Sequence, residues 1–223
     1  MIFERNLTRE ESELIQQIEA FVREKHRHEG GHDYSHILAV TDYAIQIARA
    51  IPEEVNPFVL ICGALFHDIG WIGTVTGVMH GLRGATVTEE YFASAGVSDD
   101  LRRRIKRVVV RHTASSHLPP ETVEEKIVWD ADGLEALGLI GMLRGIIGGR
   151  GSIEDILTAR IRYGTKYFDH LCFEETRRIG EKLQEQTEMV VQRFQEALEA
   201  RKEQIEELEL PYVERQPAPL SQS

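Results

Sequence analysis

Cysteines are scarce in this sequence, and so are positive charges. The 223 residues include two cysteines, Cys62 and Cys172, which lie far apart in apolar runs and form no CxxC pair. That usage excludes a disulfide framework and a zinc-finger spacing. Lysine and arginine number 26 against 37 aspartates and glutamates, a formal net charge of −11. Because a polyanion is bound by clustered positive charge, this balance argues against a nucleic-acid polymer as partner.

Long apolar runs and a leader segment are also missing. The longest apolar run, Phe58 to Phe66, spans about half of the roughly 20 residues that cross a membrane. The first residues, MIFERNLTREESE, are charged early and lack the apolar stretch of a signal peptide. With 42% hydrophobic and 28% charged residues, the composition is that of a soluble globular protein. We therefore expect a cytoplasmic protein without a membrane partner.

Strand-like alternation is lacking too, and helical spacing runs through most of the chain. Thr8 with Glu11 and Thr122 with Glu125 have the spacing of capping boxes at helix starts. The run from Pro57 to Phe66 has no polar face, which predicts a helix that is buried on all sides. These patterns predict an all-α fold.

A long amphipathic helix is expected from Glu174 to Leu210. Its apolar stripe fits packing on the body of its own domain, which we favour. The competing interpretation is a coiled-coil contact with a partner helix, and a homodimer stays open as the assembly. No linker divides the preceding chain, so residues 1–210 are predicted to form one helical domain. The tail, residues 211–223, is predicted to be disordered from its composition.

Three short segments place imidazole or carboxylate groups beside apolar sequence. They are GHDYSH at residues 31–36, the pair HD at residues 67–68 and WDAD at residues 129–132. Burying such groups without a partner is costly, so they need hydrogen bonds, ion pairs or a metal. His112 shares a helix face with two apolar residues, and His80 begins a helix after a glycine-rich loop. The sequence thus predicts that several histidines lie in the interior.

The order of these groups resembles a known family. His36, then His67 and Asp68, then Asp132 follow the H…HD…D order of the HD-domain metal-dependent phosphohydrolases. The surrounding words GHDYSHILAV, LICGALFHDIG and KIVWDADGLEALGLIG are similar to words of small bacterial HD proteins that include nucleotide pyrophosphatases. The resemblance covers most of residues 30–200. It implies an HD-domain helical bundle that carries the long C-terminal helix.

The resemblance also implies a divalent metal, with Mn, Fe, Mg, Ni, Co and Zn all compatible with mixed histidine and carboxylate ligands. The residues implied as its ligands are His36, His67, Asp68 and Asp132. His32 is the rival for the first position, and Asp130 is the rival for the last. Asp68 is further implied as the catalytic residue, which would also orient the attacking water.

Neighbouring residues are expected to support this site. Asp33 and Asp130 are expected to accept hydrogen bonds that orient ligand imidazoles. The alternative for both is helix capping or a place on the surface, and for Asp33 the two interpretations stand equal. His32 is otherwise expected near the substrate. Four basic residues are candidate phosphate contacts, although each also fits an ordinary surface charge: Arg83, Arg111, Lys126 and Arg144. Arg111 directly precedes His112 and is therefore expected close to the site.

The sequence departs from the family words at several positions. Ala39 and Gly133 stand where those words have basic residues, which would change the substrate if these groups contact phosphates. With His80 and His112 included, the order of residues becomes H…HD…H…H…D, which resembles another group of HD relatives. In those relatives two metals share the aspartate of the HD pair. The two histidines are candidates for a second metal or a substrate phosphate, with ordinary core and helix-start positions as the alternative.

Three functions follow from these expectations. The first is a metal-dependent phosphohydrolase that cleaves a phosphoester or phosphoanhydride of a small phosphorylated substrate, a nucleotide by resemblance. The second is a di-iron oxygenase of the HD type that acts on a small polar molecule. The third is a binding module that senses a nucleotide without turnover.

Overall fold

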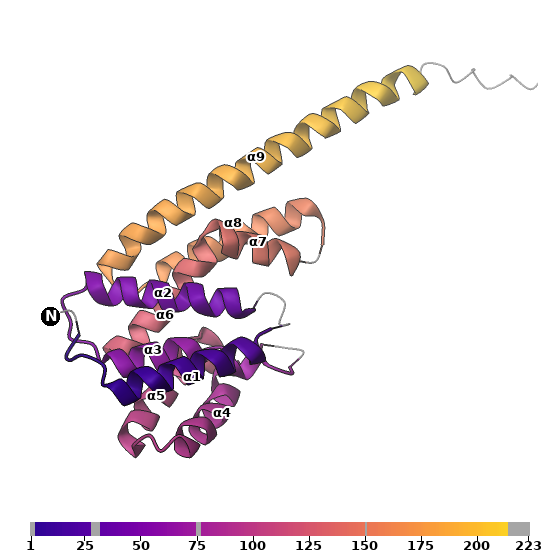
Figure 1. Ribbon diagram of the computed structural model, residues 1–223. Helices are drawn as coiled ribbons and strands as arrows, with labels where there is room; N and C mark the ends of the chain where they lie inside the picture. Colours follow the sequence, from indigo (N-terminus) through magenta and orange to yellow (C-terminus); the bar gives the residue numbers. More distant parts are fainter. Residues whose placement is uncertain (1–2, 28–31, 75–76, 150, 214–223) are drawn as a thin grey trace, which may run out of the picture.

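Helices make up the computed structural model of the chain (Figure 1). The structure describes residues 3–27, 32–74, 77–149 and 151–213. Its elements are α1 (Arg9–Lys25), α2 (Tyr34–Ala50), α3 (Pro57–Phe66), the short 3-10 helix η1 (Ile69–Trp71), α4 (His80–Ser94), α5 (Asp99–Arg111), the 3-10 helix η2 (Ala114–Ser116), α6 (Val123–Leu137), α7 (Leu139–Ile147), α8 (Ile153–Asp169) and α9 (Glu174–Val213). Within the described ranges, extended backbone pairs at a single isolated bridge. The predicted all-α fold is therefore confirmed.

The apolar helix α3 lies at the centre of the bundle. Asn56 caps it by accepting a hydrogen bond from the backbone N–H of Val59 at 3.0 Å. Pro57 occupies the first turn, where its missing N–H costs nothing. Nine of the ten residues of α3 are buried, and α1, α2, α5 and α6 pack around it. The predicted burial on all sides is thus confirmed.

The helix starts that the sequence predicts are confirmed at both capping boxes. Thr8 and Glu11 exchange side chain–backbone hydrogen bonds at the start of α1, and Thr122 and Glu125 do the same at the start of α6. The end of α5 differs from the expectation. The sequence predicts a helix that includes His112, but α5 ends at Arg111 and His112 is its C-cap.

The last three helices lie together on one side of the bundle (Figure 1). Helix α8 packs against α6 and α9, and the first part of α9 also packs against α6. Helix α9 then extends away from the body as one continuous helix of 40 residues. It therefore runs three residues beyond the expected end, to Val213. Residues 214–223 lie outside the described residues, and the division into one domain and a tail stays a prediction.

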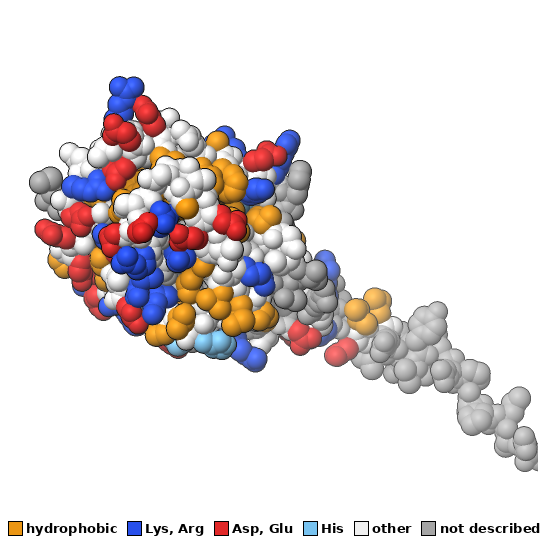
Figure 2. Space-filling model, turned by 90° about the horizontal axis from the view of Figure 1, so that it is seen from below, with side chains coloured by type: hydrophobic (Ala, Val, Ile, Leu, Met, Phe, Trp, Pro, Cys, Tyr) orange, Lys and Arg blue, Asp and Glu red, His pale blue; other side chains and the backbone are white. Residues whose placement is uncertain are grey.

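The surface carries charges of both signs. Figure 2 shows basic and acidic side chains mixed over the face that it presents, with apolar side chains between them. Along the arginine-rich α5, basic groups pair with acidic ones, as Arg102 does with Glu89 at 2.9 Å and Arg107 with Glu125 at 2.7 Å. In the described part of the chain, every helix is too short or too polar to cross a membrane.

The contact between α3 and α5 allows a test of this packing. A Cβ atom on Gly63 would lie 2.6 Å from Cγ1 of Val108, which is inside van der Waals contact. We expect Gly63→Ala to lower the free energy of unfolding by about 1–3 kcal/mol, because overpacking outweighs the better helix propensity of alanine. Gly164→Ala on α8 is the control, since its Cβ would meet Leu137 at an ordinary 3.7 Å. Urea unfolding measures both variants, and equal stability of the two would contradict the packing.

Candidate metal centre

The end of α3 delivers two polar residues into the interior. His67 is the C-cap of α3, and Asp68 follows it immediately before η1. Their exposed fractions are 0% and 2%, because the apolar helix that carries them is itself enclosed. A buried carboxylate needs partners, and imidazole nitrogens supply them here.

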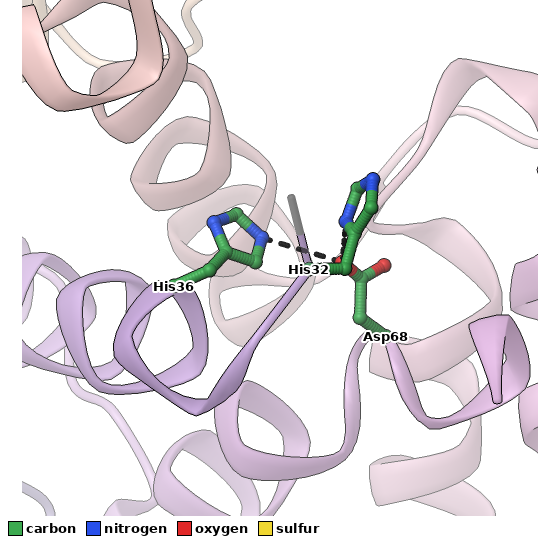
Figure 3. Close-up of side chains that lie close together, drawn as sticks. All are labelled: His32, His36 and Asp68. Atoms are coloured by element: carbon green, nitrogen blue, oxygen red, sulfur yellow. Dashed lines mark hydrogen bonds and ion pairs between the residues drawn. The ribbon is translucent and has the colours of Figure 1, made fainter. Parts of the chain in front are cut away.

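One carboxylate oxygen of Asp68, Oδ2, faces histidines from two directions. Nδ1 of His32 lies 2.6 Å from it, and Nε2 of His36, at the start of α2, lies 3.3 Å from it (Figure 3). Nε2 of His67 lies 3.5 Å from the same oxygen and 3.2 Å from Nε2 of His36. Oδ1 of Asp132, on α6, lies 3.5 Å from Nε2 of His36. The structure thus brings together the four residues that the family resemblance implies as metal ligands.

The other oxygen of Asp68, Oδ1, faces a second pair of histidines. Nε2 of His80, the first residue of α4, lies 3.2 Å from it, and Nε2 of His112 lies 3.3 Å from it. The two Nε2 atoms lie 2.9 Å from each other. Gly70 permits this approach, because a Cβ atom there would lie 1.9 Å from the carbonyl oxygen of His80. Asp68 therefore bridges two groups of imidazoles, with His32, His36 and His67 at one oxygen and His80 and His112 at the other.

Backbone carbonyl groups fix the protonation of three of these rings. Nδ1 of His67, His80 and His112 each lies 2.7 Å from the carbonyl oxygen of the residue three positions earlier. Since a carbonyl oxygen can only accept, each Nδ1 carries the proton, and each neutral ring turns an Nε2 lone pair toward Asp68. Two such lone pairs 2.9 Å apart repel each other unless a proton or a cation lies between them. The arrangement therefore fits metal ions, which bind the unprotonated nitrogen of a neutral imidazole.

The charges around Asp68 shift pKa values toward an ionised carboxylate and a bound positive charge. Burial opposes ionisation of Asp68, but the surrounding imidazoles outweigh it and hold the pKa of this carboxyl well below its usual range. Burial also disfavours a charged His36, yet Asp68 and Glu135 raise the pKa of His36 to about 10. For His112 burial prevails and lowers the pKa. The side of the centre around His36 therefore attracts positive charge most strongly.

His32 and His36 are rivals for the first ligand position, and the structure places both at Asp68. The His36 side chain is 5% exposed, whereas the His32 side chain is 34% exposed. The His32 ring stacks on the indole of Trp71, with 4.1 Å between the ring centroids. His36 thus lies in the interior of the centre, and His32 lies on its solvent side.

Asp130 lies outside the centre, which corrects its expected part in orienting an imidazole. Its buried carboxylate accepts hydrogen bonds from the backbone N–H groups of Cys172 at 2.7 Å and Phe173 at 3.1 Å. It therefore anchors the segment that leads into α9. Asp132, two residues later, lies on a different face of α6, where His36 approaches.

Glu135, which the sequence did not single out, occupies the position beside an imidazole that was expected of Asp33. Oε2 of Glu135 lies 3.2 Å from Nδ1 of His36. Asp33 caps α2 through the N–H of His36 and pairs with Arg144 at 2.8 Å, which agrees with the helix-capping alternative given for it. Burial opposes ionisation of Asp33, but hydrogen bonds, among them that of Arg144, lower its pKa to about 2. The spacing of Asp132 and Glu135, three residues apart on one helix face, is the signal that could have found Glu135.

The four candidate phosphate contacts have different surroundings, and Lys126, half-buried on α6, stays a prediction. Arg144 borders the centre through its ion pairs with Asp33 and Glu135. Arg111, the last residue of α5, pairs with Glu121 at 2.9 Å, and its contact with a phosphate stays a prediction. Arg83 donates to backbone carbonyl groups of the segment before α4.

A cavity of about 630 Å³ opens beside Asp68. Residues of the centre and of α7 and α8 line it, among them His32, His36, Asp68, Trp71, His80, Thr113, Ser115, Asp132, Glu135, Arg144, Arg160 and Tyr167. Two of these side chains, Arg144 and Arg160, are cationic. The cavity therefore joins carboxylates and imidazoles that can hold metal ions to arginines that can attract an anion.

The family comparison matches the segment that holds this centre. The family model for the HD domain matches residues 33–137, which include all the candidate ligands except His32. This segment of the chain therefore matches the HD-domain family that the sequence words resemble.

Individual relatives share this fold. Bacillus subtilis YpgQ is 28% identical over 120 residues, which are 51% of this chain and 55% of YpgQ. The crystal structure of YpgQ in complex with ADP matches with a TM-score of 0.67 at 20% identity, covering 84% of this chain and 96% of that chain. A predicted HD superfamily hydrolase from an uncultured Thermotogales bacterium matches with a TM-score of 0.60 at 25% identity, covering 82% and 92% of the two chains.

A further sequence match is to a larger protein. A tRNA (cytidine(56)-2'-O)-methyltransferase of Picrophilus torridus is 32% identical over 119 residues, which are 47% of this chain and 32% of that protein. The chain thus spans about a third of this methyltransferase and about half of YpgQ in the sequence matches.

Asp130 and Asp132 provide a matched pair of variants that separates structure from metal binding. We expect Asp130→Ala to lower the free energy of unfolding by about 1–3 kcal/mol, because two backbone N–H groups lose their acceptor, and to leave metal content unchanged. Asp132→Ala is expected to reduce metal content instead. Elemental analysis and thermal unfolding measure both effects. Metal loss in Asp130→Ala with full metal in Asp132→Ala would reverse the assignment.

Proposed function

We propose that the protein is a metal-dependent phosphohydrolase. The observation that carries the proposal is the position of Asp68, whose two carboxylate oxygens each face two histidine Nε2 atoms within 3.5 Å. Imidazole nitrogens and carboxylate oxygens are ligands for divalent metals of the first transition row. The HD domain and the similar fold of a solved HD superfamily hydrolase support the proposal.

Two ligand groups follow from the two oxygens of Asp68. One metal would be held by His36, His67, Asp68 and Asp132. A second would be held by Asp68, His80 and His112. The mixture of nitrogen and oxygen donors is compatible with Mn, Fe, Mg, Ni, Co and Zn.

The chemistry divides between the metal and the chain. A divalent metal bound here supplies a Lewis acid that polarises a phosphoryl oxygen and lowers the pKa of bound water. Asp68, whose position is fixed by the surrounding imidazoles, would orient that water for attack. Arg144 and Arg160 line the same cavity and draw an anionic group toward the centre. The products are those of phosphoester or phosphoanhydride hydrolysis.

A nucleotide is the substrate class that we propose. YpgQ, which has a similar fold, was solved in complex with ADP. The cavity of about 630 Å³ lies within the range of about 300–1,000 Å³ that is usual for small-molecule sites. A small phosphorylated molecule therefore fits the space and the charge of the site.

A di-iron oxygenase is the second candidate, because the six residues that such a centre would use lie together. They are His36, His67, Asp68, His80, His112 and Asp132. Tightly bound iron together with oxygen consumption on a small polar substrate would favour this candidate. A nucleotide-sensing module would instead bind metal and nucleotide without turnover.

Replacement of the shared carboxylate tests the proposal. We expect Asp68→Ala to lose bound metal and to reduce hydrolysis of nucleotides and simple phosphoesters by more than about a hundredfold, because both ligand groups use this side chain. Asp42→Ala on the exposed face of α2 is the control, since the Asp42 carboxylate accepts a hydrogen bond from Gln46 at the surface. Elemental analysis and assays of phosphate and pyrophosphate release measure the two effects. Full hydrolysis by Asp68→Ala would overturn the proposal.

A further inference from the structure

A second, smaller cavity of about 230 Å³ adjoins the metal centre. His112 and Asp132, two members of the centre, form part of its wall. Much of the remaining wall is aromatic or apolar and comes from α6, α8 and the segment before α9: Trp129, Tyr167, His170 and Leu171. The hydrolytic chemistry described above makes no use of this space.

The aromatic wall is fixed by the fold. Nε1 of Trp129 donates to the carbonyl oxygen of His170 at 3.0 Å. This bond ties α6 to the segment that leads into α9 and uses the polar edge of the indole within the protein. A fixed indole whose N–H is satisfied offers its apolar surface to a ligand at little cost in conformational entropy.

Gly133 keeps the small cavity open. A Cβ atom there would lie 3.2 Å from Cδ2 of Leu171 and 3.9 Å from Cδ1 of Tyr167, so a longer side chain would project into the cavity. A glycine inside a helix is less favourable than alanine. The position of Gly133 in the middle of α6, next to Asp132, is therefore explained by the space that it leaves.

Two hydroxyl groups mark the passage between the small cavity and the large one. Thr113 and Ser115 line both cavities, as do Asp132 and Tyr167. Oγ of Ser115 lies 3.5 Å from Nδ1 of His80, which places this hydroxyl at the edge of the metal centre. The small cavity thus offers aromatic and apolar surface together with Lys166, and the large cavity holds most of the metal-binding groups and two arginines.

We propose that the small cavity binds the nucleobase of a nucleotide, that the hydroxyls of the passage face its sugar, and that its phosphates lie in the large cavity beside Arg144 and Arg160. This inference rests on the proposed function and assigns each part of the substrate to a wall of the site. The small cavity is below the roughly 300–1,000 Å³ of sites that enclose a whole drug-sized ligand, so it takes one ring system. Stacking on aromatic side chains suits any base, because every base has a π-face. Gly133 determines the size of the ring that fits.

The test compares two ligands that differ by the nucleoside. The methylene-bridged analogue of ADP and methylenebisphosphonate share a bisphosphonate group whose P–C–P linkage resists hydrolysis. Calorimetry measures their affinities for the manganese-loaded protein. We expect the nucleoside-containing analogue to bind about fivefold or more tightly, since stacking of one base contributes at least about that factor. Gly133→Leu is expected to abolish this preference and to leave the affinity for methylenebisphosphonate unchanged, whereas the control Gly164→Ala keeps the preference.

A second variant covers the case in which Gly133→Leu fails to fold or loses bisphosphonate binding. Tyr167→Ala removes one aromatic wall at a position that is 40% exposed, and we expect it to weaken the preference several-fold. Equal affinities of the two ligands for the wild-type protein would overturn the base site and leave the proposed function intact. A preference that survives in folded Gly133→Leu or in Tyr167→Ala would overturn it as well. If the metal-loaded wild-type protein bound neither ligand, the proposed function itself would fail, and this inference with it.

Discussion

The buried carboxylate of Asp68 requires several helices of the bundle to supply it with partners. A carboxylate at 2% exposure is strongly disfavoured without partners, and imidazoles from α2, α3, α4 and the end of α5 surround this one. These histidines are far apart in the sequence. The same helix contacts that pack the bundle around α3 therefore also bring the histidines to Asp68. The bundle therefore places its most polar group at the end of its most apolar helix.

Helix ends explain how the imidazoles are held. The last carbonyl groups of an α-helix have no partner within the helix. His67 and His112 are the C-caps of α3 and α5, and each uses such a carbonyl, three residues earlier, to hold its Nδ1 proton. These two hydrogen bonds give partners to carbonyl groups at two helix ends. They also leave Nε2 of each ring unprotonated and facing Asp68. A metal centre gains its pre-set ligand orientation from this arrangement.

Much of the fold was predictable because its signals are local, whereas parts of the site were not. The capping box of Thr8 and Glu11 lies within four residues, and the family words identify the candidate ligands by their order. Helical spacing did not separate Asp130 from Asp132, since the partners of Asp130 are backbone groups more than 40 residues later. Arg111 likewise pairs with Glu121, which lies just before α6 and comes close because α6 packs against α5. Such roles are set by tertiary contacts that no local pattern contains.

The number of metal ions bound per chain decides whether Asp68 joins two metal sites. Elemental analysis of untagged protein after reconstitution with a divalent metal should give about two ions per chain, and about one for His80→Ala, which removes a ligand of the second group alone. A single ion in the wild-type protein, unchanged in His80→Ala, would contradict the bridging role of Asp68. A protein that binds no metal at all would contradict the centre as a whole.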